Sequence, residues 1–499
     1  MTDRPAKTVY LETMGCQMNV LDSELVLGQL RRAGYCLTDQ FKTADLVLLN
    51  TCSVRRHAED KVYSRLGEIG SAQRRSGRRD QIVGVIGCMA ERDRAGLLEK
   101  CPQVDILCGP NELNQIPKLV LEVTESRKRA IALSDDRSRK IPVEQRSAQL
   151  DSLEALDLSR ELGPEASRVQ AYVRVQRGCD KFCTYCVVPF TRGPERSRPP
   201  SHIVSEAKLL VDQGMMEITL LGQTVNSYVH TENGRTVRFA ELLEMVAQVP
   251  GLERLRFVTS FPADFAEDIL CAMRDLPQVC EYLHLPAQSG SNRVLRDMKR
   301  QHTVEHYDEL IAKAREIVPG INLAGDFIVG FVGETEDEFA ESVALVERTQ
   351  YKNIFVFKYS PRPGTAADRR QVDDVPNAVK RRRNTELLAV QERISLANNG
   401  KLIGREVEIL VEGYSKAAEK LRRQEEPEEA RPGGPQGETL ARTSGAPDTR
   451  IPRPTRSQLT GRTRGDQIVV YDGPASDIGR LKRVRITAAS ALTLHGTSV

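Results

Sequence analysis

The stretch RGCDKFCTYCVVPFTRG at residues 177–193 decides how the central part of this chain folds. It places Cys179, Cys183 and Cys186 in a C-x3-C-x2-C run. The run directly follows the apolar stretch AYVRVQ at 171–176, which predicts a buried strand. A loop of this length can hold three thiolates against one face of a 4Fe-4S cube and leave one iron open to bind a substrate.

A structural zinc site is the alternative interpretation of such a run, but zinc needs a fourth ligand. The nearest downstream candidates are His202 and Cys271, so no local ligand closes the site. We therefore favour the cluster. The neighbours that we expect to shield it, or to moderate its negative charge, are Phe182, Tyr185, Val187, Val188, Arg177 and Lys181.

Six apolar runs, separated by helix-like stretches, extend outward from this motif at 171–177, 217–222, 254–259, 282–286, 321–332 and 353–359. Strands that alternate with helices favour parallel pairing. Six such repeats predict a partial (β/α)6 barrel over residues 169–395. In barrels of this kind the chemistry lies at the carboxyl ends of the strands, where the cysteine run begins.

The first part of the chain, residues 1–126, shows the same alternation on a smaller scale and predicts an α/β domain with a doubly wound parallel sheet. Its strand-like runs lie at 9–16, 46–52, 82–88 and 104–108. Cys16, Cys52 and Cys88 end three of these runs at equal spacing. Because the carboxyl ends of parallel strands meet at one edge, we expect a second three-cysteine site. Cys108 ends the fourth run, and spacing alone does not exclude it.

Residues 127–168 are polar and charged, and we interpret them as a linker. The tail, 396–499, carries short alternating runs at 406–415, 465–473 and 481–490, which predict a small β-barrel. An insertion at 417–456 interrupts it. Its density of proline, glycine and charge does not allow enough apolar burial to order a backbone.

The bulk composition fits a multi-domain protein of 499 residues with 40% hydrophobic and 28% charged residues. Lys and Arg number 72 against 69 Asp and Glu, so any basic surface must come from local segregation. No signal peptide and no membrane-length apolar run is visible, so we expect a cytoplasmic protein without a membrane partner. In that compartment eleven cysteines are better explained by metal ligands than by disulfides.

The cysteine loop at the first strand of a six-repeat β/α domain resembles the radical S-adenosylmethionine superfamily. The resemblance implies that the open iron binds S-adenosylmethionine and that the cluster splits it to a 5′-deoxyadenosyl radical. TMGCQMN at 13–19, NTCSVR at 50–55 and GCMAER at 87–92 are similar to the motifs of the methylthiotransferase N-terminal domain, which carries a second 4Fe-4S cluster. This similarity selects Cys16, Cys52 and Cys88. It leaves the others as small buried thiols, namely Cys36, Cys101, Cys108, Cys271 and Cys280.

CTYCVVPFTRGPERSRP at 183–199 and LLGQTVNSY at 220–228 resemble the tRNA 2-methylthio-N6-isopentenyladenosine synthases. The similarity covers nearly the whole chain and implies methylthiolation at C2 of the prenylated adenosine next to the anticodon. Thr224 departs from the asparagine typical of the family. The alternatives are a sister methylthiotransferase, acting on threonylcarbamoyl-adenosine of tRNA or on an aspartate of a ribosomal protein, and a non-catalytic iron–sulfur protein for RNA binding or electron transfer.

Several polar residues beyond the cysteines are candidates for contact with S-adenosylmethionine, although each is equally compatible with a satisfied loop residue. They are Tyr185, Gln223, Asn226, Ser260 and Gln288. GDFIVGFVGET at 325–335 is similar to the strand of the superfamily that supports adenine, where glycine permits close approach of the backbone.

The tail resembles a TRAM domain, a small oligonucleotide-binding barrel. This implies that Lys and Arg at 456–464 and 480–485 contact phosphates, with Tyr414 and Tyr471 as stacking candidates. We interpret KRRR at 380–383 as solvated charge on a helix surface. The expected partners are the tRNA anticodon loop and a reductant protein such as flavodoxin or ferredoxin. We expect a monomer.

Overall fold

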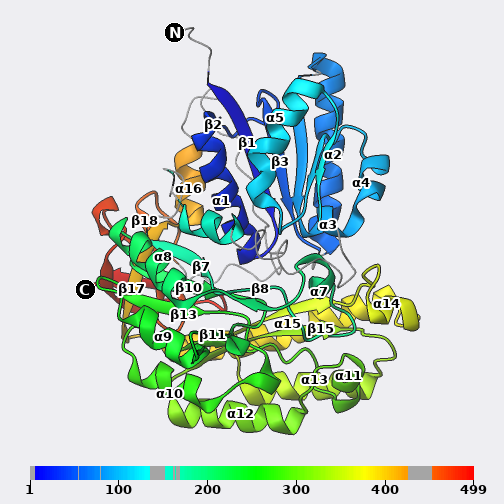
Figure 1. Ribbon diagram of the computed structural model, residues 1–499. Coiled ribbons are helices and arrows are strands. Elements are labelled where there is room, and N and C mark those ends of the chain that lie inside the picture. The colour runs from blue at the N-terminus through cyan, green and yellow to red at the C-terminus, as the bar shows by residue number, and fades with distance from the viewer. Residues whose placement is uncertain are drawn as a thin grey trace.

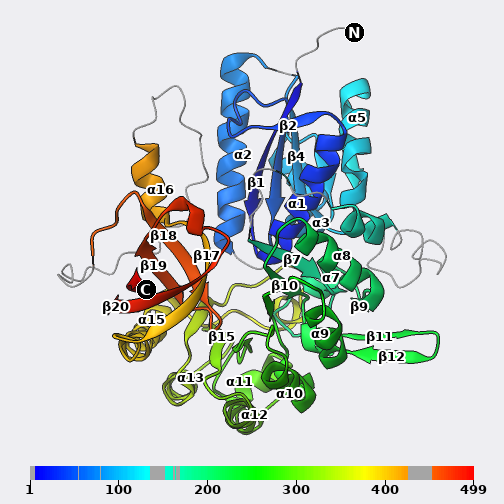
Figure 2. The same ribbon diagram turned by 90° about the vertical axis from the view of Figure 1, so that its left-hand side faces the viewer.

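The computed structural model describes residues 6–53, 56–78, 80–134, 152–160, 163, 169–424 and 452–499. The chain forms an N-terminal sheet with helices, a central set of strands and helices, and a C-terminal barrel (Figures 1 and 2). In Figure 1 the N-terminal part stands above the central part. Within the described ranges, no helix has the combined length and apolar character that crossing a membrane requires.

The N-terminal sheet has six parallel strands in the order β2-β1-β3-β4-β5-β6. Their bounds are β1 Lys7–Met14, β2 Tyr35–Leu37, β3 Leu46–Thr51, β4 Ile82–Gly87, β5 Ile106–Cys108 and β6 Ala130–Ala132. The helices are α1 Gln17–Arg32, α2 Arg56–Ser76, α3 Cys88–Asp93, α4 Ala95–Lys100 and α5 Ile116–Ser126. In β3, Leu46 and Leu48 pack with α1 and α5, whereas Val47 and Leu49 pack with α2 and α4. Both faces of the sheet are therefore buried, which explains the continuous apolar runs.

Two segments of the expected linker, 127–168, belong to the structured part of the molecule. Strand β6 pairs with β5, so the N-terminal sheet extends beyond the expected boundary at residue 126. Residues 152–158 are helical, and Asp157 on this turn is almost fully buried. The interpretation of 127–168 as a plain linker is wrong at these two places, because long-range pairing supplied partners that the local pattern does not show. Residues 135–151 lie outside the described residues.

The central part contains two three-stranded parallel sheets, β13-β10-β7 and β14-β15-β16. The strands are β7 Gln170–Arg174, β10 Glu217–Leu221, β13 Arg254–Phe257, β14 Tyr282–His284, β15 Asn322–Val329 and β16 Asn353–Lys358. Backbone hydrogen bonds of 2.7 and 2.9 Å join Leu255 of β13 to Gln278 and Cys280, just before β14. Five of these strands fall within the apolar runs predicted for them, and β7 begins one residue before its run.

Helices and short strands surround these two sheets, and one apolar core lies between the strands and the helices. The helices are α7 Val188–Thr191, α8 Pro200–Asp212, α9 Phe239–Ala247, α10 Glu267–Asp275, α11 Asn292–Asp297, α12 Val304–Ile317, α13 Glu336–Thr349, α14 Ala366–Arg370 and α15 Asn377–Gly400. The short strands are β8 Gln176–Arg177, β9 Arg196–Ser197, β11 Val229–Glu232 and β12 Arg235–Arg238. Figure 2 shows the β11–β12 hairpin extending away from the body of the molecule.

The C-terminal part is a closed barrel in the order β17-β18-β19-β21-β20. Its elements are β17 Glu406–Tyr414, α16 Lys416–Arg423, β18 Gln458–Thr463, β19 Ile468–Asp472, β20 Leu481–Ala489 and β21 Thr493–Ser498. Strands β17, β19 and β20 match the predicted runs, whereas β18 and β21 were not predicted. The expected insertion, 417–456, begins inside helix α16, and residues 425–451 lie outside the described residues.

The barrel is fastened to the central sheet by buried arginines. Arg254 and Arg256 of β13 donate hydrogen bonds to the carbonyls of Arg462 and Thr463, at 2.6 and 2.7 Å. In return, the guanidinium of Arg464 pairs with Glu281 at 2.8 Å. The expectation that the basic residues at 456–464 contact phosphates is therefore wrong for Arg464, which closes this internal interface.

Two further expectations for charged or aromatic residues are also wrong. Tyr471 is buried and donates a hydrogen bond to Asp477 at 3.0 Å, so it is not available to stack on bases. In KRRR at 380–383, Arg381 and Arg382 are exposed, but Lys380 and Arg383 are among the most deeply buried charges of the chain.

Candidate active site

The first cysteine trio lies on a loop whose entry requires glycine. Gly178 has a φ of 67°, and a side chain there would collide with the carbonyl oxygen of Pro194. The amide of Cys179 donates to the carbonyl of Gly193 at 3.1 Å, which ties the beginning of the loop to its end. A bond of 3.0 Å from the amide of Cys186 to the carbonyl of Cys183 closes the turn between the last two cysteines. The sequence therefore folds the run back on itself.

Cys179 is buried, and Cys183 and Cys186 are half-buried. Burial raises the pKa of Cys179 to about 11 and that of Cys186 to about 12, and a negative charge on Cys183 raises both. The guanidinium of Arg300 lies 3.7 Å from the sulfur of Cys183. Thiolates are thus costly here unless a cation or a metal compensates them.

The immediate surroundings differ in part from the expectation. Val187 and Val188 are buried, as predicted, but Phe182 is 38% exposed and makes an edge contact with Phe190, which is 40% exposed. Arg177 does not face the trio, because Asp157 and the carbonyl of Leu153 hold its guanidinium. Arg300 faces the trio instead, and nothing in the local sequence marks it for this position.

The second trio lies at the edge of the N-terminal sheet. Met14, Thr51 and Gly87 are register partners on β1, β3 and β4. Cys52 and Cys88 directly follow Thr51 and Gly87, and Cys16 lies two residues after Met14. The equal spacing in sequence therefore becomes proximity in space, as predicted. Cys108 differs, because it is the last residue inside β5 and packs in the apolar core.

Local side chains fix this edge of the sheet. The amide of Asn19 donates to Asn50 at 2.8 Å, and the amide of Asn50 donates back to the carbonyl of Asn19 at 2.8 Å. Gly87 has a φ of 92°, and a Cβ there would lie 2.6 Å from the Asn50 side chain. Only glycine permits this close approach, so Gly87 lets the strand deliver Cys88 to the trio.

The pKa values of the thiols in the second trio depend on the cysteines themselves and on Arg192. A hydrogen bond from Cys52 lowers the pKa of Cys16 below that of an ordinary thiol. Burial raises the pKa of Cys88, and the positive charge of Arg192 partly opposes this. Arg192 comes from the central part of the chain, directly after α7.

A cavity of about 130 Å³ opens between the two trios. Ser53, next to Cys52, lines it from the N-terminal sheet, and Cys186 lines it from the first trio. Its other walls come from the ends of β15 and β16 and from neighbouring loops, namely Tyr185, Val187, Gln288, Asp326, Ile328, Phe357, Lys358, Tyr359, Ser360 and Arg362. The cavity therefore joins residues that lie far apart in the sequence.

Of the five candidates for contact with S-adenosylmethionine, Tyr185 and Gln288 line the cavity. The side-chain oxygens of Gln288 and of buried Ser260 have no hydrogen-bond partner among the described residues. Asn226, in contrast, uses its amide in two bonds with the backbone of Phe261, at 2.9 and 2.7 Å. Gln223 is half-buried on the loop after β10. Cofactor contact by these residues stays a prediction.

The backbone of Gln288 adopts the left-handed conformation with a φ of 73°, which typically costs a non-glycine residue about 1 kcal/mol or more. Hydrogen bonds to the carbonyl of Asp326, at 2.8 Å, and from the amide of Ile328, at 2.9 Å, hold it there. Strained residues of this kind gather at ligand sites. The geometry of Gln288 thus suits a residue that presents its amide to a bound molecule.

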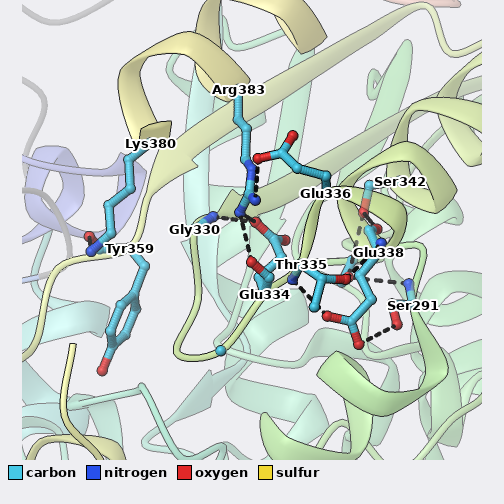
Figure 3. Close-up of polar contacts among 12 residues, drawn as sticks. Ser291, Gly330, Glu334, Thr335, Glu336, Glu338, Ser342, Tyr359, Lys380 and Arg383 are labelled. Carbon is cyan, nitrogen blue, oxygen red and sulfur yellow. Dashed lines mark hydrogen bonds and ion pairs between the residues drawn. The ribbon is translucent and has the colours of Figure 1, made fainter. Parts of the chain in front are cut away.

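Helix α15 supports the wall of this cavity through its buried cations (Figure 3). Arg383 pairs with Glu334 at 2.8 Å, and Glu334 in turn accepts a hydrogen bond from the amide of Gly330 at 2.5 Å. Lys380 donates to the carbonyl of Tyr359 at 3.2 Å. The helix therefore fixes the loop after β15 and the end of β16. Lys380 and Arg383 continue the buried stripe of Leu387, Val390 and Ile394, a spacing that marks them as inward-facing.

Replacing Arg383 by methionine should lower the free energy of unfolding by about 3 to 5 kcal/mol at neutral pH, because it leaves Glu334 buried without its cation. Burial already raises the pKa of Glu334. A raised pKa in the folded state means that stability is present at acid pH and is lost as the pH rises through that pKa. The loss in the variant should therefore be smaller at about pH 5 than at about pH 8, as measured by urea unfolding.

Arg381→Met is the matched control for this test, since Arg381 is exposed on the same helix turn. It should change stability by less than about 0.5 kcal/mol. A loss in Arg383→Met that is equal at both pH values would show that the buried Glu334 charge does not cause it.

The donor chemistry at both trios fits 4Fe-4S clusters. No disulfide occurs among the cysteines. In the described part of the chain, no three His, Cys, Asp or Glu side chains are close enough together to hold a single metal ion. A 4Fe-4S cube binds each thiolate to a different iron, so its ligands lie further apart than those of one ion.

Comparison with known proteins agrees with this geometry. Residues 173–346 match the model of the Radical SAM superfamily, and residues 8–109 match that of the Uncharacterized protein family UPF0004. A solved structure, the radical S-adenosylmethionine methyltransferase TsrM from Kitasatospora setae, superposes with a TM-score of 0.52 at 15% identity. The match covers 73% of this chain and 74% of that one. The fold and the cysteine loop thus define a radical S-adenosylmethionine protein.

The curated relatives narrow this class. A tRNA-2-methylthio-N(6)-dimethylallyladenosine synthase from Rhodopirellula baltica is 45% identical over 98% of this chain and 95% of its own length. The enzyme of that name from Moorella thermoacetica is 41% identical over 99% of this chain and 98% of its own length. The chain belongs to the family of tRNA-2-methylthio-N(6)-dimethylallyladenosine synthases.

Proposed function

We propose that this chain adds a methylthio group to C2 of N6-dimethylallyladenosine in tRNA, next to the anticodon. The observation that carries the proposal is the 45% identity to the Rhodopirellula baltica enzyme over nearly the full length of both chains. The two cysteine trios and the cavity between them support it, because sulfur insertion of this kind needs a radical site beside a sulfur-carrying site.

Each trio has one role in this proposal. Cys179, Cys183 and Cys186 hold the cluster that binds S-adenosylmethionine, and Cys16, Cys52 and Cys88 hold the second cluster. When bound, these groups supply the radical, the methyl group and the site of sulfur transfer. The chain itself positions them by strand register and by the tight turn at Gly178.

Other residues bind and orient what enters the cavity. The unpaired oxygens of Ser260 and Gln288 suit the polar groups of S-adenosylmethionine, and Tyr185 closes the cavity next to Cys186. Ile328 and Phe357 give the cavity an apolar side, which suits a prenyl chain better than a carboxylate. Ser53, which lies two residues after β3 of the N-terminal sheet, contributes to the wall of the cavity.

The finer architecture and the partners belong to the same proposal. We infer that the two central sheets form one partial (β/α)6 barrel, that the N-terminal sheet is doubly wound, and that the closed barrel is a TRAM domain. Arg480 and Arg483 are exposed on that barrel and are available for tRNA phosphates. A flavodoxin- or ferredoxin-type reductant supplies electrons to a cytoplasmic monomer.

Nucleoside mass spectrometry of tRNA tests the proposed function. Cells that express this chain should contain 2-methylthio-N6-dimethylallyladenosine. Cells that carry the Cys183→Ala variant instead should accumulate N6-dimethylallyladenosine without the methylthio group. The same spectra report methylthio-threonylcarbamoyl-adenosine. Loss of that nucleoside in the variant, with the prenylated one unchanged, would assign the chain to the sister activity and contradict the proposal.

A further inference from the structure

A buried carboxylate joins the N-terminal sheet to the central part of the chain. Asp22 of α1 is fully buried and accepts from two guanidiniums, Arg174 at 2.9 Å and Arg192 at 2.9 Å. Arg174 is shared with a second buried carboxylate, Asp157, at 3.0 Å. Asp22 thus shares its single negative charge between Arg174 and Arg192. It does not fully neutralise the positive charge of Arg192.

Arg192 also reaches the second cysteine trio. Asp22, which holds the guanidinium of Arg192 at 2.9 Å, belongs to α1, and this helix begins directly after Cys16. The place of Arg192 follows from the chain, since α7 directly follows Cys186 and packs against α3, which begins at Cys88 (Figure 1). The chain segment that carries the first trio therefore also places the cationic side chain of Arg192 beside the second trio.

We propose that Arg192 is a positioning residue for the second cluster, which compensates the negative charge of the group held by Cys16, Cys52 and Cys88. This inference rests on the proposed function, because it requires a cluster at that trio. A cluster with thiolate ligands is an anion, and its reduced form is more negative than its oxidised form. A buried guanidinium stabilises the reduced form more and raises the reduction potential, while Asp22 fixes the orientation of that guanidinium.

The test uses full-length protein in which Cys179, Cys183 and Cys186 are alanine, so that only the second cluster forms on reconstitution with ferrous iron and sulfide. A redox titration followed by electron paramagnetic resonance then measures one cluster. Replacing Arg192 by glutamine should shift the midpoint potential to a more negative value. Asp22→Asn, which removes the opposing carboxylate, should shift it in the opposite direction.

Arg198→Gln is the matched control. Arg198 is as deeply buried and pairs with Glu154 and Glu206, both at 2.7 Å, and with Asp157 at 3.6 Å, but it forms no ion pair with Asp22 in the described part of the chain. Its loss should affect stability without moving the potential. With the first trio intact, Arg192→Gln should lower methylthiolation about 10- to 100-fold and leave formation of 5′-deoxyadenosine near the wild-type rate.

The outcomes separate the inference from the function on which it rests. A potential that stays at the parent value in both Arg192→Gln and Asp22→Asn, with unchanged iron content, would overturn the role of Arg192 and leave the two-cluster function standing. A parent protein that binds no iron at the second trio would overturn the two-cluster function itself, and the inference with it. Arg192→Lys keeps the charge and should retain most of the parent potential.

Discussion

Replacing Cys183 by alanine should abolish formation of 5′-deoxyadenosine from S-adenosylmethionine, a fall of about a thousandfold or more, and with it methylthiolation of tRNA. Cys183 lies between Cys179 and Cys186 on the loop, and its negative charge acts on both thiols. Two thiolates do not hold a 4Fe-4S cube with one open iron. Iron should fall from about eight to about four atoms per chain, because the second trio is intact. Anaerobic reconstitution, iron analysis and chromatography of the nucleoside products measure these effects.

Cys280→Ala is the control for this prediction. Cys280 is 1% exposed in the same central part, and burial raises the pKa of its thiol to about 11, as at Cys179. Its replacement should cost about 1 kcal/mol of stability and keep both clusters. Wild-type yields of 5′-deoxyadenosine from Cys183→Ala would assign the open-iron site to other residues.

The elements that carry the clusters could be predicted from the sequence, because their signals are local. Strand β3 is buried on both faces and therefore reads as a continuous apolar run that ends at Cys52. The run before Cys88 has the same form, whereas β1, before Cys16, is longer and buried at only some positions. Parallel pairing brings the carboxyl ends of these three strands to one edge. The positions of the three cysteine loops thus follow from the length and register of the strands. The amino-acid pattern indicates both.

The charged network could not be predicted, because its partners are distant in sequence. Arg174 pairs with Asp22, which is 152 residues away in the sequence. No local sequence pattern distinguishes a buried arginine from a solvated one. Arg300 beside Cys183 is a similar case. Lys380 and Arg383 are different, since they continue the apolar stripe of α15 in register, and the helical period indicates that they face inward.

Strands β18 and β21 of the C-terminal barrel could not be predicted for another reason. In β18, QLTGRT, the inward positions include a glycine that packs against the carbonyl of Leu410, so the alternation of apolar residues is broken. The closed barrel supplies the pairing that a short polar strand lacks alone. The resemblance to a TRAM domain implies that basic residues of this strand contact RNA, whereas Arg462 pairs with Glu412 at 3.0 Å and with Asp466 at 2.7 Å.

Replacing Cys52 by alanine should separate the two activities that the loss of Cys183 removes together. The first trio and its cavity wall are untouched, so 5′-deoxyadenosine should form within about twofold of the wild-type rate. Methylthiolation should fall by about a thousandfold or more, because Cys52 is the central member of the second trio, between Cys16 and Cys88 on adjacent strands. Iron should again fall to about four atoms per chain. Assays of both products on the same reconstituted sample measure the separation.

Cys108→Ala tests whether the selective loss of methylthiolation is specific to the trio or follows from replacing any buried cysteine of the sheet. Cys108 ends the neighbouring strand β5 and is fully buried, but its thiol donates to the carbonyl of Gly109 inside the apolar core. Its replacement should keep both products and the full iron content. If Cys52→Ala still methylthiolated tRNA while Cys108→Ala did not, the ligand set would contain Cys108, and β5 rather than β3 would supply the third thiolate. The sheet order places β5 beyond β4 and away from β1, which is why we expect Cys16, Cys52 and Cys88 to be the ligands.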